Sequence, residues 1–172
     1  MRVAEIAPIP HEDLAEGSHL SVSVVAGPNL SLWSIATDRS CDTDTEFKFQ
    51  IQPDQAVVIG RQQGGRIEYL DERYQPTQLV PNSAQRVVGS HDKVADNRVS
   101  RGHFMLRDSP RGLELVNGVP RHGGGIRPPI NGTKMLKPER RTMQDGEDFV
   151  IERGKSVTIC LPNGTVIVLG AE

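Results

Sequence analysis

Three short motifs in the sequence carry residue types that bind an anion. Gly60-Arg61 ends an apolar run, Ser100-Arg-Gly-His103 precedes another, and Asn131-Gly-Thr133 follows a stretch rich in Gly and Pro. A phosphate group needs a fixed cation together with short hydroxyl or amide donors on preorganised loops. The motifs are therefore candidates for an anion-binding site.

The charge of the chain is unevenly distributed, although the formal net charge is only −2 at pH 7. Residues 98–141 hold ten Lys and Arg against three Asp and Glu, whereas residues 1–97 hold eight against fourteen. Such a segment is either an anion-binding surface or a solvated face with scattered arginines. Because Phe, Tyr and Trp are scarce in it, it lacks the aromatic platform on which nucleic-acid bases stack, and we expect no nucleic-acid partner.

Short apolar runs separated by turn residues surround the motifs. They predict strands at 20–25, 30–35, 47–51, 56–60, 66–70, 103–107, 112–116, 148–152, 156–160 and 165–169. The first two are expected to pair as a hairpin across Gly27-Pro-Asn29. No amphipathic helix is predicted. The expected fold is an all-β sandwich of about ten to eleven short strands with no major helix.

The pattern predicts one folded domain with one irregular region inside it. Residues 1–18, which include two prolines and an acidic stretch, are expected to form a flexible N-terminal tail, and residues 19–170 the sandwich. Periodicity fades from 71 to 97, where only isolated apolar pairs such as Val87-Val88 occur. This region is predicted to be a long loop or insertion, of the kind that is usually functional or mobile.

In their order and separation the motifs resemble those of the forkhead-associated (FHA) domain family. That family has Gly-Arg after a strand, Ser-x-x-His before a strand and Asn-Gly in a loop, and residues 143–151 resemble its Leu-x-x-Gly-Asp-x-Ile segment. The resemblance spans roughly residues 19–170. It implies an FHA-like β-sandwich that binds phosphothreonine-containing proteins or peptides downstream of a Ser/Thr protein kinase, without a cofactor.

The resemblance also implies a phosphopeptide-binding set drawn from the three motifs: Arg61, Ser100, Arg101, Asn131 and Thr133. Arg61 would bind the phosphate with its guanidinium group, and Ser100 would donate its hydroxyl. His103 would act inside the protein and hold the loop that presents the serine. Gly60 and Gly132 would support the site in the same structural sense.

The sequence departs from the family pattern around Asn131. The family has Gly-Ser-Thr-Asn-Gly-Thr followed by a second Asn-Gly, but this region holds a single Asn-Gly. If Asn131 belongs to the first element, Pro129-Ile130 replaces the Ser-Thr pair and Asn131 contacts the ligand backbone, an alignment that Thr133 favours. If it belongs to the second, the loop from Gly123 to Arg127 faces the ligand.

Two other function classes fit parts of the sequence. The run His122-Gly-Gly-Gly125 resembles the oxyanion-hole loop of lipases and esterases, but the chain has no Gly-x-Ser-x-Gly elbow, so we expect no enzyme activity. The stronger alternative is an assembly or scaffold domain of FHA fold that binds an unphosphorylated protein partner. The irregular region 71–97 and the departure around 123–130 both fit that alternative.

Cysteine spacing and hydropathy bear on metal binding and location. Cys41 and Cys160 are the two cysteines and lack Cys-x-x-Cys or His-rich spacing, so no metal site is expected. No run approaches the roughly 20 apolar residues of a membrane span, and the first residues lack the pattern of a secretory signal. The expected location is the cytoplasm, with no membrane partner.

Overall fold

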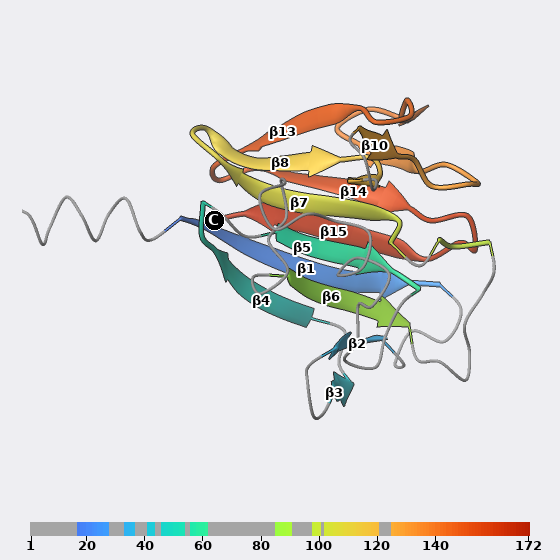
Figure 1. Cartoon of the computed structure of the whole chain (residues 1–172), viewed down its shortest axis with the longest axis horizontal. Helices are drawn as coiled ribbons and strands as arrows, with labels where there is room; N and C mark the ends of the chain where they lie inside the picture. Colours follow the sequence, from blue (N-terminus) through green and yellow to red (C-terminus); the bar gives the residue numbers. More distant parts are fainter. Residues whose placement is uncertain are drawn as a thin grey trace, which may run out of the picture.

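Strands make up the regular secondary structure of the part of the chain that the structure describes. The structure is a computed structural model that describes residues 17–27, 33–36, 41–43, 46–53, 56–61, 85–90, 98–100, 102–120 and 125–172. Within these ranges the chain forms two large sheets and a small two-stranded ribbon, and none of it forms a helix that could cross a membrane (Figure 1).

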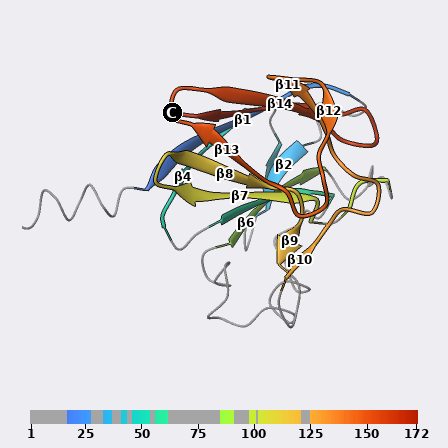
Figure 2. The ribbon, with the colours of Figure 1, turned by 90° about the horizontal axis from the view of Figure 1, so that it is seen from above.

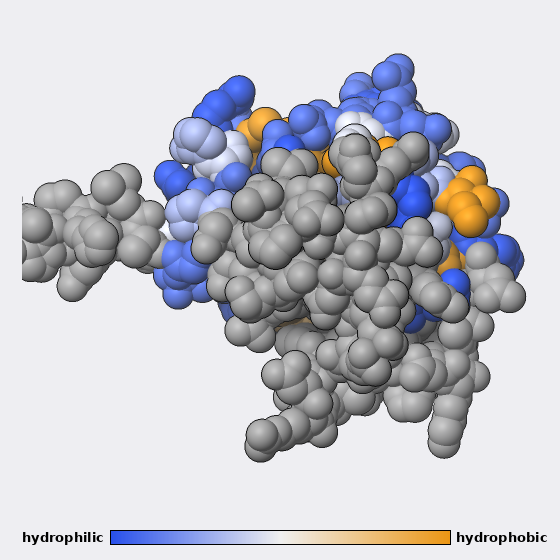
Figure 3. Space-filling model, in the orientation of Figure 1, coloured by the Kyte–Doolittle hydropathy of each residue, from blue (hydrophilic) through white to orange (hydrophobic). Residues whose placement is uncertain are grey.

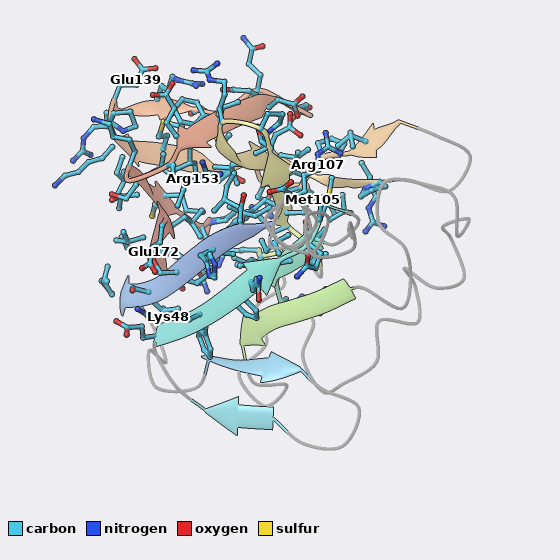
Figure 4. All side chains as sticks on the ribbon, turned by 90° about the vertical axis from the view of Figure 1, so that its left-hand side faces the viewer. Lys48, Met105, Arg107, Glu139, Arg153 and Glu172 are labelled. Atoms are coloured by element: carbon cyan, nitrogen blue, oxygen red, sulfur yellow. The ribbon has the colours of Figure 1, made fainter. Side chains whose placement is uncertain are left out.

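The first sheet has six antiparallel strands in the order β12-β11-β14-β15-β1-β4. Their bounds are β1 Ser18–Ala26, β4 Glu46–Ile51, β11 Lys134–Lys137, β12 Arg141–Thr142, β14 Ser156–Cys160 and β15 Val166–Ala171. The C-terminal residue Glu172 lies beside Lys48 of β4, 3.8 Å away in an ion pair between exposed side chains (Figure 4). The end of the chain therefore lies at the β1–β4 side of this sheet.

The second sheet has seven strands in the order β13-β8-β7-β5-β6-β2-β3. Their bounds are β2 Trp33–Ala36, β3 Cys41–Thr43, β5 Ala56–Gly60, β6 Gln85–Ser90, β7 Phe104–Ser109, β8 Gly112–Val116 and β13 Asp148–Glu152. Only β5 and β6 pair in parallel. The ribbon pairs β9 (Val119–Pro120) with β10 (Ile126–Arg127).

The hydrophobic core lies between the two sheets. Alternate residues of a strand point to the same face, so Leu20, Val22 and Val24 of β1 turn one apolar row inward. The facing sheet contributes Ile59 of β5 and Phe104 of β7, neither of which is exposed at all. Figure 2 shows the two layers, with β14 and β1 above β8 and β7. The expected all-β sandwich without a major helix is confirmed for the described residues.

The strand pattern predicted 56–60, 112–116, 148–152 and 156–160 with the same bounds that the structure has for β5, β8, β13 and β14. The described residues nevertheless hold fifteen strands rather than ten or eleven. Most of the additional strands are very short, and β9, β10 and β12 have two residues each. Two residues show no periodicity, so composition cannot reveal them. The strand expected at 66–70 lies outside the described residues.

The hairpin expected between the first two strands is wrong. β1 pairs with β15 and β4, whereas β2 belongs to the other sheet and pairs with β6 and β3. At Gly27, whose φ is +123°, a Cβ would lie 2.5 Å from the Cα of Thr165. The chain leaving β1 therefore packs against the β14–β15 turn, which a local pattern of turn residues cannot indicate.

The irregular region 71–97 also needs correction, because β6 lies within it. This strand runs parallel to β5, with Val58 opposite Val87, and pairs with β2 on its other side. Parallel neighbours need a connection of a dozen residues or more, which explains why β5 and β6 lie so far apart in sequence. Residues 71–84 and 91–97 lie outside the described part of the chain.

The tail boundary predicted at residue 18 can be examined only at its last two residues. Ser18 begins β1 and is 3% exposed. Its hydroxyl bonds the carbonyl oxygen of Gly112 at 2.8 Å and also contacts the Asp108 carboxylate. Ser18 therefore belongs to the sandwich, and residues 1–16 lie outside the described part.

Candidate functional site

Three segments that are distant in sequence meet at one end of the sandwich. They lie at the end of β5 (60–61), before β7 (98–100 and 102–103) and before β11 (128–133), and we call them the three site loops. The end of β5 lies beside the start of β7 because Ile59 pairs with Phe104 (Figure 1). The loop before β11 joins them through a hydrogen bond from the Ile130 amide to the Ser100 hydroxyl oxygen, at 3.1 Å.

Arg61 is fixed to the loop before β7 by two bonds. Its backbone amide donates to the carbonyl oxygen of Ser100 at 2.9 Å, and its side-chain Nε donates to the carbonyl oxygen of Val99 at 3.0 Å. A guanidinium group has five N–H donors, of which this Nε bond uses one. The bond sets the orientation of a partly exposed cation, and the four donors on its terminal nitrogens take no part in it.

Ser100 is held so that its hydroxyl acts as an acceptor within the protein. Its backbone amide donates to Nδ1 of His103 at 3.1 Å, and its Oγ accepts from the Ile130 amide. A hydroxyl has one proton to donate in addition to its two acceptor lone pairs. The bond from Ile130 occupies a lone pair of the Ser100 hydroxyl. The proton of this partly exposed hydroxyl takes no part in that bond.

His103 joins all three site loops from inside the protein. Its side chain is fully buried, its amide donates to the Ile59 carbonyl at 2.9 Å, and its Nδ1 accepts from Ser100. Because Nδ1 is an acceptor, Nε2 carries the proton and donates to the carbonyl oxygen of Gly132 at 2.7 Å. Burial lowers the pKa of His103 from 6.5 to about 4, against a smaller opposing effect of the Gly132 bond, so the ring is neutral at pH 7.

The same bonds decide whether Ser100 and His103 are arranged as a nucleophile and its base. A nucleophilic serine needs its hydroxyl within hydrogen-bond reach of a basic nitrogen. Here Nδ1 of His103 bonds the amide of Ser100, and Nε2 faces a carbonyl oxygen. Both ring nitrogens are therefore occupied by main-chain groups, which suits a structural histidine.

The loop before β11 presents Asn131 and buries Thr133. Asn131 is exposed, and its Nδ2 donates to the carbonyl oxygen of Arg98 at 2.9 Å, which uses one of its two amide protons. Gly132 has φ of +78°, where non-glycine residues are disfavoured, and no atom lies within 4 Å of the position of a Cβ. Thr133 is 1% exposed, so its side chain lies below the surface of the loop.

The remaining predicted site residues divide between described and undescribed parts of the chain. Gly60 ends β5 and is buried at the base of the site. Arg101 and residues 121–124 lie outside the described ranges, and so does the start of the Gly123–Arg127 loop that is the alternative ligand-facing segment. The end of that loop, Ile126–Arg127, forms β10 of the ribbon.

Sequence reasoning missed three contributors to the site. Arg98 and Val99 act through carbonyl oxygens that orient Asn131 and Arg61, and a main-chain role leaves no trace in residue type. Ile130 acts through its amide and is also 88% exposed. An isoleucine in a loop rich in Gly and Pro was the one feature of the sequence that could have indicated this contribution. In the described ranges no group of three or more His, Cys, Asp and Glu is placed to hold a metal ion.

Comparison with known proteins finds similarity to a solved structure. No protein-family model matches the sequence, and no curated protein matches it. The chain is similar to the crystal structure of the FHA-1 domain of Mycobacterium tuberculosis Rv1747, at 16% sequence identity and a TM-score of 0.41. The match covers 90% of this chain and 97% of that one. The chain itself is an all-β sandwich in its described residues, with the three motifs at loops on one end.

Proposed function

We propose that this chain is a phosphothreonine-dependent protein-binding module that acts in Ser/Thr-kinase signalling. The observation that carries the proposal is the placement of Arg61 and Ser100 on adjacent loops, joined by the 2.9 Å bond between the Arg61 amide and the Ser100 carbonyl. Both side chains are partly exposed. The bond from Arg61 Nε to Val99 and the bond from the Ile130 amide to Ser100 Oγ orient the cation and the hydroxyl before a ligand arrives.

Phosphate suits this arrangement better than a carboxylate does. A phosphothreonine carries a charge of about −1.5 to −2 at pH 7 and three strong acceptor oxygens. The terminal nitrogens of Arg61 offer donors in a planar fork, and the Ser100 hydroxyl offers one more beside it. Because His103 fixes the loop from below, little ordering entropy is lost on binding.

The protein part of the ligand would lie along the loop before β11. Asn131 is exposed next to Ile130, whose amide bonds Ser100. An amide side chain has both donors and an acceptor, so it matches the alternating groups of a peptide backbone. Asn131 is therefore assigned to the peptide rather than to the phosphate, and the buried Thr133 is left out of the proposed contact surface.

A direct test is binding to a phosphothreonine peptide library, with the same peptides unphosphorylated as the comparison. We expect binding that depends on the phosphate and that falls about ten- to a hundredfold in Arg61→Ala, since bonds between charged groups are worth about 1.5–3 kcal/mol. Arg111→Ala is the matched control, because Arg111 is an exposed arginine in the β7–β8 turn that pairs with Glu152 of β13. Equal binding of both peptide forms would reject the proposal and favour an unphosphorylated partner.

A further inference from the structure

One large apolar side chain in the three site loops faces solvent. Ile130 is 88% exposed, and among the described residues the only other exposed large hydrophobic residue is Val25, at 50%. Single exposed apolar residues are common on protein surfaces, so exposure alone indicates nothing. In Figure 3, separate apolar areas lie among hydrophilic ones on the visible surface of the described part. What distinguishes Ile130 is the way it is held.

Ile130 is fixed in position from both sides. Its amide donates to the Ser100 hydroxyl oxygen, the group assigned above to the phosphate. Before it, Pro128 and Pro129 have a fixed φ, and Pro129 is buried. After it, the Gly132 amide bonds the Pro129 carbonyl at 3.4 Å, and His103 holds the Gly132 carbonyl at 2.7 Å. An exposed isoleucine on so constrained a turn would lose little conformational freedom when it is covered.

We propose that Ile130 determines the specificity of the site by contacting an apolar side chain of the ligand, within two residues of the phosphothreonine. The inference rests on the proposed function. The Ile130 amide nitrogen lies 3.1 Å from Ser100 Oγ. A phosphate oxygen that accepts a hydrogen bond from Ser100 would lie about 2.7 Å from that Oγ. Extended peptide residues advance about 3.3–3.6 Å each, so only the nearest neighbours of the phosphothreonine reach the Ile130 side chain.

The chemistry of that neighbour follows from the contact. Covering an aliphatic side chain is favourable when apolar groups replace the water on it, and unfavourable when a charged ligand group loses its own hydration there. The segment around the site is rich in Lys and Arg, so its charge alone would favour acidic residues throughout the ligand. A preference for an aliphatic residue at one position beside the phosphothreonine would therefore come from Ile130 and not from the positive charge.

The test uses short peptides with phosphothreonine at the centre, in an Ala-Gly background, with Leu, Ser or Glu placed in turn at the two positions on either side. We expect the wild-type chain to prefer Leu by about five- to tenfold at one of these positions. Ile130→Ser should bind the Leu and Ser peptides equally, whereas Ile130→Leu should keep the preference. Val25→Ser removes the other exposed apolar side chain, on β1, and should behave as wild type.

The outcomes of this experiment distinguish a failure of the inference about Ile130 from a failure of the proposed function. Phosphate-dependent binding without an apolar preference at any of the four positions would overturn the role of Ile130 and leave the proposed function intact. A preference that survives in Ile130→Ser would also overturn it, by assigning the contact to another residue. Loss of phosphate dependence in the wild type would reject both. An unchanged Tm for Ile130→Ser would exclude a folding defect as the cause of a lost preference.

Discussion

The Ser100 hydroxyl has an acceptor role toward the Ile130 amide, so its substitution affects the loop as well as the ligand. Ser100→Ala removes one donor to a charged phosphate, and we expect about a tenfold or greater loss of phosphopeptide affinity. Isothermal titration calorimetry would measure it. Ser109→Ala is the matched control, because that hydroxyl also accepts from a backbone amide, that of Arg111 at 3.4 Å, at the opposite end of β7. Equal affinities of wild type and Ser100→Ala would contradict the assignment.

Burial of His103 should make the stability of the fold depend on pH. Its pKa lies at about 4 in the folded protein and near 6.5 when the ring is exposed in the unfolded chain. Between these values the unfolded chain binds more protons, so the free energy of unfolding should fall as pH drops from about 6.5 to 4, by roughly 3 kcal/mol in all. Urea denaturation at several pH values in this window would measure the slope.

The control for this prediction is His103→Gln, which has a donor and an acceptor but does not titrate. It should be less stable than the wild type at pH 7, because the two main-chain partners of the ring are satisfied less well. It should also lose most of the slope above pH 5. The pKa of Glu147 is lowered from 4.5 by its bond to Arg141, so its contribution is lost at more acidic pH. An identical slope in both proteins would show that His103 is not the titrating group.

The sequence indicated the polar side chains of the candidate site, but not the main-chain atoms that orient them. Arg61, Ser100 and His103 are recognisable because cation, hydroxyl and imidazole chemistry depends on the side chain. The carbonyl oxygens of Arg98, Val99 and Gly132 could belong to any residue, and their positions depend on how loops distant in sequence meet. The burial of Thr133 was unforeseeable for the same reason.

At the scale of the element, the Asn131-Gly132 and Asn163-Gly164 turns differ in what the asparagine bonds. Asn163 Oδ1 accepts from the Thr165 amide at 3.1 Å, within the β14–β15 turn, whereas Asn131 Nδ2 donates to Arg98 in another loop. Asn131→Ala should therefore lose about tenfold in phosphopeptide affinity, about 1.4 kcal/mol, with a small change in Tm. Asn163→Ala should lower Tm with little change in affinity. Calorimetric titration would measure the affinity of the two variants, and thermal denaturation would measure their Tm.

The opposite ordering of these two variants would remove Asn131 from the contact surface. It would then favour the other alignment of the sequence, in which the Gly123–Arg127 loop faces the ligand. Asn131→Asp offers a further comparison, since it keeps the shape of the side chain but replaces the donor to the Arg98 carbonyl by an acceptor and adds a negative charge near the phosphate. Affinity should fall further in this variant than in Asn131→Ala.

Strand periodicity was sufficient to predict most longer strands but not their partners. Five consecutive apolar or small residues predicted β5, and all five are buried in the sheet. The pairing of β5 with β6, and of β1 with β15, joins residues separated by long stretches of sequence. Such pairings depend on which strands meet in the core, so turn signals near Gly27 predicted a hairpin that does not exist.

For the molecule as a whole, the positive segment is less positive in three dimensions than in sequence. Arg107 pairs with Glu114, Arg111 with Glu152, and Arg141 with both Glu139 and Glu147. Figure 4 shows Arg107 and Glu139 at well-separated places on the described part. Carboxylates from inside and outside the segment thus neutralise part of its charge. Attraction for a phosphate then depends on the oriented Arg61 rather than on net charge, and raising the salt concentration should weaken binding only moderately.

The last prediction concerns pH and combines the ligand with the whole protein. The second pKa of a phosphothreonine is near 6, so the ligand loses negative charge as the pH falls from about 7 to 5. His103 stays neutral through this window because its pKa is about 4, and it gains no compensating positive charge at the site. Phosphopeptide affinity should therefore fall several-fold between pH 7 and pH 5, as fluorescence anisotropy with a labelled peptide would measure.

Circular dichroism at each pH provides the control, because the stability lost through His103 protonation in the unfolded chain must not leave the protein partly unfolded at pH 5. If the sandwich stays folded and affinity falls with an apparent pKa near 6, the ligand's own titration accounts for the loss. A flat profile would mean that the monoanion binds as well as the dianion. A decline only below about pH 4.5 would instead assign the effect to His103, whose protonation would abolish the acceptor for the Ser100 amide and release the loop.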